Sequence, residues 1–147
     1  MEHTFSHSLF TTPFDHNTDF TELADTCERF VEALVECDIP AQKMALCGRL
    51  FACLTLLQST LLEPVPEHLK ASLTVDDLPL EQPEFEPEAD QTGRFCQLLT
   101  QLILNQSLSK SDERVAGDLL QELVGFYSDT LKAPHWLRTK DGVVPLL

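Results

Sequence analysis

Five acidic residues recur at intervals of three and four in the first half of the chain. They are Glu22, Asp25, Glu28, Glu32 and Glu36. On a helix, which rises about 1.5 Å per residue, this spacing places the five carboxylates on one face, roughly 6 Å apart. Like charges at this spacing repel each other by about 0.2 to 0.5 kcal/mol per pair. Such a face attracts a basic protein surface, or else contributes to solubility alone.

A second acidic group surrounds a single aromatic residue. Phe85 lies between Glu84 and Glu86, in a stretch of the chain, residues 63–92, that has nine acidic residues, five prolines and Lys70 as its one basic residue. Short acidic segments with an apolar anchor dock in basic-rimmed grooves, although plain spacers have the same composition. These three residues and the five helical carboxylates are the predicted partner-binding residues.

The sequence contains none of the common catalytic templates. It has no Glu-x-x-His, no His-Glu-x-x-His and no Gly-x-Ser-x-Gly, and its five glycines are scattered. His135 lies between Pro134 and Trp136, which is typical of a packed tail residue rather than of a catalytic base. We therefore expect no catalytic residue, no cofactor and no metal site.

The net charge limits the classes of partner. The chain has 24 acidic and 10 basic residues, a formal charge of −14. Nucleic acid and anionic membranes both require a basic surface, so neither is an expected partner. A protein with a basic surface is the expected one, because opposite charge accelerates encounter.

Five cysteines, an odd number, lie mostly at apolar positions of helical patterns. They are typical of reduced, buried thiols, which indicates a reducing compartment. The N-terminus has neither a basic start nor a long apolar run, and the most apolar helical stretch contains Arg49. We therefore expect a cytoplasmic protein with no signal peptide and no membrane span.

The predicted fold is all-α, a four-helix bundle-like single domain of residues 18–147 that follows an N-terminal arm, residues 1–17, without regular structure. Apolar periodicity and helix-start signals predict four helices. They cover residues 18–37, 40–62, 94–108 and 111–132. A long acidic, proline-rich connector, residues 63–92, joins the second helix to the third, and a C-terminal tail, residues 133–147, folds Trp136 back onto the bundle.

The second predicted helix is apolar on almost every side and is expected to be central. One stripe is small, consisting of Ala41, Ala45, Gly48, Ala52, Thr55 and Ser59. Another stripe is bulky, consisting of Met44, Cys47, Phe51, Leu54, Leu57 and Leu61. The small stripe would let a neighbouring helix approach closely, while the bulky stripe would fill the core.

These features favour a non-catalytic, acidic protein-binding module of the adaptor or dedicated chaperone type. The alternative is an immunity protein or decoy inhibitor that blocks a basic nucleic-acid-binding or nuclease surface. The alternative predicts affinity that falls steeply with salt, whereas an adaptor with apolar contacts is less sensitive to salt. A homo-oligomer is a further prediction, because the outer row of the third helix, Gln97, Gln101 and Asn105, is uncharged.

Overall fold

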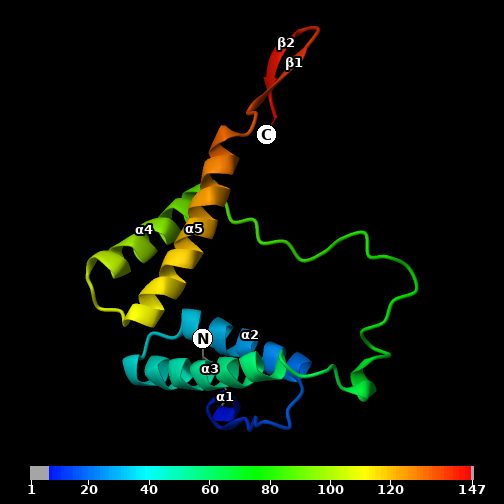
Figure 1. Cartoon of the computed structure of the whole chain (residues 1–147), viewed down its shortest axis with the longest axis vertical. Coiled ribbons are helices and arrows are strands. Elements are labelled where there is room, and N and C mark those ends of the chain that lie inside the picture. Colours follow the sequence, from blue (N-terminus) through cyan, green and yellow to red (C-terminus); the bar gives the residue numbers. More distant parts are fainter. Residues whose placement is uncertain (1–6, 147) are drawn as a thin grey trace. The chain divides into compact units, whose positions relative to one another are not determined.

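The computed structural model describes residues 7–146 and is mostly helical (Figure 1). The chain divides into two compact units, with the boundary between Pro79 and Leu80. Unit 1 contains a packed helix pair, α2 and α3, and unit 2 contains another, α4 and α5. The helical class predicted from the sequence is therefore confirmed, but a four-helix bundle is not, because the helices pair within units.

Helix α2 (Phe20–Glu36) begins and ends close to the predicted positions. Its N-cap is Asp19, whose side chain accepts hydrogen bonds from the backbone N–H groups of Thr21 at 2.9 Å and Glu22 at 3.0 Å. This cap satisfies two of the donors that a helix start leaves unpaired. The helix buries Leu23, Phe30 and Ala33 against α3, whereas its apolar residues Val31 and Val35 are exposed.

Helix α3 (Pro40–Thr60) starts with proline at its first turn, where the missing N–H is harmless. Only Leu46 and Cys53 are fully buried, with Leu50 and Leu57 packed beside them. The expectation that this helix is enclosed was wrong for the structure of unit 1, because only α2 and the arm pack against it. The exposed residues include the whole small stripe and, of the bulky stripe, Met44, Cys47, Phe51, Leu54 and Leu61.

The N-terminal arm contains a short helix, α1 (His7–Thr11), although the sequence gave no periodicity there. Leu9 enters the core of unit 1, which explains why a segment without a helical pattern becomes ordered. The Arg49 side chain donates a hydrogen bond to the carbonyl of Thr12, and its guanidinium lies 4.7 Å from the ring centre of Phe14. These contacts hold the arm against α3. Residues 1–6 of the predicted arm lie outside the described residues.

The connector contains one 3-10 turn, η1 (Glu67–Leu69), and is otherwise irregular. The His68 imidazole lies 3.9 Å from the Asp19 carboxylate, so this end of the connector returns to the start of α2. Helix α4 (Ala89–Leu104) begins five residues before the predicted position. No proline lies between Pro87 and the end of the helix, and the buried Thr92 hydroxyl donates to the carbonyl of Glu88 at 2.9 Å.

Helix α4 also ends before the predicted Leu108, at a turn in which Gln106 adopts a positive φ of 56°. A left-handed residue beyond the C-cap commonly ends a helix, although glycine is the usual choice. Helix α5 (Lys110–Lys132) follows with Ser109 as its N-cap, close to the predicted bounds. The two helices form an antiparallel pair in unit 2.

The C-terminal tail forms a hairpin of two antiparallel strands, β1 (Trp136–Thr139) and β2 (Gly142–Pro145). The prediction that Trp136 folds back was wrong for the described chain, because the residue pairs with Pro145 and is 64% exposed. Lys140 and Asp141 form the turn, and Gly142, the first residue of β2, has a φ of 120° that suits glycine. The segment predicted as a C-terminal tail thus forms a small two-stranded β-hairpin (Figure 1).

Candidate functional site

The five predicted carboxylates of α2 all lie on its exposed side, as the pattern predicted. We call Glu22, Asp25, Glu28, Glu32 and Glu36 the acidic face. Within residues 7–146, the ion pairs are His68 with Asp19 at 3.9 Å and Arg94 with Asp90 at 3.3 Å. Arg29, the one basic residue of α2, donates instead to the Thr26 hydroxyl at 3.3 Å. No basic side chain of the described chain therefore neutralises the acidic face.

A groove of about 420 Å³ lies between α2 and α3, and its lining combines acidic and apolar side chains. Helix α2 contributes Cys27, Glu28, Val31 and Glu32, and helix α3 contributes Leu50 and Leu54. We call this the α2–α3 groove. It brings two residues of the predicted acidic face together with apolar residues, one of which, Leu54, belongs to the bulky stripe predicted to fill the core.

The apolar surface continues beyond the groove along both helices. Phe51 of α3 is 73% exposed, and Val35 of α2, one turn after Val31, is exposed to a similar degree. Scattered exposed apolar residues are normal on a folded protein, but a contiguous group beside a groove marks an interaction surface. A signal for it was present in the sequence, because α3 is apolar on more sides than one neighbouring helix can cover.

The core of unit 1 contains one thiol, Cys53, whose chemistry differs from that of an exposed cysteine. Cys53 is fully buried, and its Sγ donates to the carbonyl of Leu23 at 3.5 Å. Burial, together with hydrogen bonding to the neighbouring Cys27 thiol, raises the pKa of the Cys53 thiol to about 12. Cys53 is therefore a neutral, structural thiol rather than a nucleophile.

The N-terminus of α2 has its own local electrostatics. Hydrogen bonds from the Thr21 hydroxyl and from the backbone N–H of Glu22 lower the pKa of Asp19 below its ordinary value of 3.8. Asp19 thus remains charged where it complements the positive end of the helix dipole. It acts as a cap, and it does not belong to the acidic face.

The three connector residues of the predicted site belong to unit 2. Phe85 is exposed in irregular backbone, with Glu84 and Glu86 on either side also exposed. Glu86 borders a cavity of about 640 Å³ beside the end of α5, which Phe126 and His135 also line. The predicted set is therefore divided, with five residues in unit 1 and three in unit 2.

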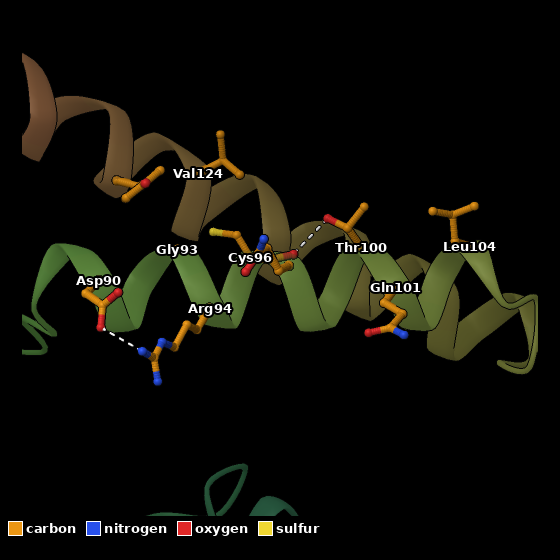
Figure 2. Close-up of a pocket in the computed structure, with 10 residues that line it drawn as sticks. Asp90, Gly93, Arg94, Cys96, Thr100, Gln101, Leu104 and Val124 are labelled. Carbon is orange, nitrogen blue, oxygen red and sulfur yellow. Dashed lines mark hydrogen bonds and ion pairs between the residues drawn. The ribbon is translucent and has the colours of Figure 1, made fainter.

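A larger hollow of about 920 Å³ follows α4, on the side of its contact with α5 (Figure 2). Arg94 in its wall is paired with Asp90, and the Thr100 hydroxyl donates to the carbonyl of Cys96 at 2.7 Å. Its other polar lining consists of the amides Gln97 and Gln101 and of Tyr127. The hollow therefore holds neither a nucleophile beside a base nor an unpaired charge that would select an ionic ligand.

Two further properties of residues 7–146 bear on function. No cluster of three or more histidine, cysteine, aspartate or glutamate side chains in that range has an arrangement suited to a metal ion. None of the helices in that range combines the length and apolar character that crossing a membrane requires.

Comparison of the chain with models of known protein families, with curated proteins and with solved structures finds no match. The function must therefore be inferred from the chain's own residues.

Proposed function

We propose that this protein is a non-catalytic binding module of the adaptor or dedicated chaperone type, which holds a basic protein partner on the acidic face of α2. The observation that carries the proposal is the row of five exposed carboxylates without an ion pair among residues 7–146. Neighbouring carboxylates repel one another, and a basic partner would turn that repulsion into attraction.

The connector supplies a second contact for the partner, which is also negatively charged. Glu84 and Glu86 flank the exposed ring of Phe85, so an apolar anchor stands between two negative charges. A flexible acidic segment of this kind binds with modest affinity and adds avidity to a first contact. Partner binding thus combines a rigid helical face with an adaptable segment.

A reducing compartment, the cytoplasm, suits this module. All five cysteines are free thiols, and three of them, Cys37, Cys53 and Cys96, are buried as small apolar side chains. Unpaired thiols persist where glutathione and thioredoxin keep them reduced.

The test is capture of partners from the native source by the full chain, at low and at high salt, followed by mass spectrometry. In the variant E28Q/E32Q/E36Q we expect capture of basic partners at low salt to weaken by about tenfold or more, because three charges of the contact are lost. The stability of the variant should stay the same or rise, since repulsion between neighbouring carboxylates is removed.

The matched control carries the same change of charge on α5. The variant D118N/E122Q/D129N replaces three exposed acidic residues that belong to unit 2 and not to the acidic face. It should capture the same partners as the unmodified chain. Unchanged capture by E28Q/E32Q/E36Q would show that the acidic face contributes only solubility.

A further inference from the structure

The α2–α3 groove has two parallel rows of different chemistry on its α2 side. Cys27 and Val31 are one helical turn apart, and so are Glu28 and Glu32, so a carboxylate row runs beside an apolar row. Across the groove, Leu50 and Leu54 are also one turn apart. The groove therefore has an apolar floor between two helices and a negative rim along α2.

The arm of unit 1 covers a different side of α3. It is held at Arg49, whose guanidinium lies over the ring of Phe14. Leu54 follows Arg49 by five residues, which on a helix is a rotation of about 140° about the axis. Leu54 is 42% exposed, so the groove side of α3 stays accessible while the opposite side is occupied by the arm.

The walls of the groove favour a helix as the occupant. Both walls are helices whose backbone groups are bonded internally, so an extended peptide would find no free strand edge to pair with. Side chains spaced by three and four form ridges that accept the ridges of another helix. An added helix would complete a three-helix core over Val31 and Leu54.

Charge selects among possible helices. The connector has nine acidic residues and one basic residue in 63–92, and a second copy of the chain carries a charge of −14. Both would be repelled by Glu28 and Glu32, which have no basic partner among residues 7–146. A helix with lysine or arginine beside its apolar stripe would instead bury apolar surface and pair with the rim.

We propose that the α2–α3 groove binds an amphipathic, basic helix of a partner protein. The apolar stripe of that helix packs on Val31, Leu50 and Leu54, and its basic residues pair with Glu28 and Glu32. This inference rests on the proposed function and specifies which part of the acidic face does the binding and what form the partner takes.

The test uses the full chain and a synthetic probe. The probe is a fluorescent leucine–lysine peptide of roughly 15 residues, about four helical turns, with leucine in the i, i+3, i+4 pattern. A scrambled peptide of the same composition is its control. By fluorescence anisotropy, the patterned peptide should bind about tenfold or more tightly than the scrambled one, because only the patterned peptide presents an apolar stripe.

Two pairs of variants locate the binding. E28Q/E32Q removes two charges at the groove, while D118N/E122Q removes two exposed charges from α5 in unit 2. Leu54→Gln removes apolar surface within the groove, while Met44→Gln does so on exposed α3 surface outside it. Each groove variant should weaken binding of the patterned peptide by about tenfold, and each control by less than about threefold.

The outcomes separate this inference from the proposed function. Weakening by E28Q/E32Q without weakening by Leu54→Gln would overturn the groove while leaving the acidic face as the binding surface. Unchanged binding in every charge variant would contradict both. Sedimentation of the unmodified chain as a dimer that Leu54→Gln dissociates and that does not bind the patterned peptide would identify a second copy as the occupant, and would also overturn the inference.

Discussion

The two units of the chain differ in how deeply they bury their apolar residues. In unit 1, Leu23, Phe30 and Leu46 have no exposed surface, whereas in unit 2 the most buried apolar residues, Leu123 and Cys96, are 6% and 9% exposed. Three helices contribute to the core of unit 1, because Leu9 of α1 packs beside the contact between α2 and α3. Two helices that pack alone, as in unit 2, can bury only the narrow stripe of side chains along their contact.

The units also differ in how charge is distributed on their helices. The outer side of α2 carries the five carboxylates of the acidic face, whereas α4 has no charged residue after Arg94. A rigid scaffold that presents unpaired charge is suited to preorganised binding, since little ordering is required when the partner arrives. This difference supports the proposal that the acidic face of unit 1 binds the partner.

The largest expected effect is the loss of stability when a core residue of either unit is replaced, and it compares the cores of the two units. Phe30→Ala should lower the free energy of unfolding by about 3 to 5 kcal/mol, because a fully buried aromatic side chain is lost. Leu123→Ala should lower the free energy of unfolding by about 2 kcal/mol, which is at the low end of the range for leucine. Leu123 is less completely enclosed, so neighbouring side chains can move into the space that it leaves. Urea unfolding followed by circular dichroism measures both. A greater loss for Leu123→Ala would reverse the ranking of the two units.

A second prediction concerns the pH dependence of unit 1. The Cys53 thiol keeps its proton in the native state up to a pKa of about 12, whereas in the unfolded chain it loses the proton near the ordinary value of 9.0. Above that value the unfolded state binds fewer protons than the native state, so stability falls as the pH rises. Urea midpoints measured at about pH 8 and about pH 10.5 should show the fall.

Variants isolate the thiol responsible. Cys53→Ala should be less stable at about pH 8 but should lose less stability on going to about pH 10.5, because the titrating group is absent. Cys96→Ala, which removes a buried thiol from unit 2, should keep the pH dependence of the unmodified chain. The same pH dependence in Cys53→Ala as in the unmodified chain would rule out Cys53 as its source.

The smallest expected effect compares the two N-caps. Asp19→Ala on α2 and Ser109→Ala on α5 should each cost about 1 kcal/mol, because each side chain accepts a backbone hydrogen bond at a helix start. Their pH dependence should differ. The pKa of Asp19 is lowered in the native state, so its contribution is present above 3.8 and is lost as the pH falls below it.

Ser109 does not ionise, so the cost of Ser109→Ala should be the same at about pH 6 and about pH 3. The cost of Asp19→Ala should shrink over that interval. Thermal unfolding of the two variants and the unmodified chain at both pH values measures the difference. A cost for Asp19→Ala that does not change with pH would show that its charge has no role in capping.

The local parts of the fold could be predicted from the sequence. Acidic residues spaced by three and four indicated the position of α2, and Pro40 marked the start of α3. The hairpin could not be predicted from Trp136, whose bulk indicates an anchor on the helices, and the turn residues Lys140 and Asp141 carry no glycine between the strands. Helix α1 carries too few residues for a periodic signal, and only its contact with the core orders it.

The candidate site was predicted in part. The acidic face requires only helical spacing, so its five residues could be named from sequence alone. The groove could not, because it depends on which side of α3 is covered, and α3 has apolar residues on most sides. Leu50 and Leu54 became candidate binding residues only when α2 was seen to pack beside them. Pairing between helices is a tertiary property that the periodicity of one helix does not determine.

Hydrogen exchange of the full chain, measured by mass spectrometry with and without the patterned leucine–lysine peptide, tests the central claim most directly. The account predicts that the peptide slows exchange in residues 27–35 of α2 and 47–57 of α3, and that α4 and α5 exchange at unchanged rates. Slowed exchange confined to α4 and α5, or no change anywhere at saturating peptide, would contradict the assignment of binding to the α2–α3 groove.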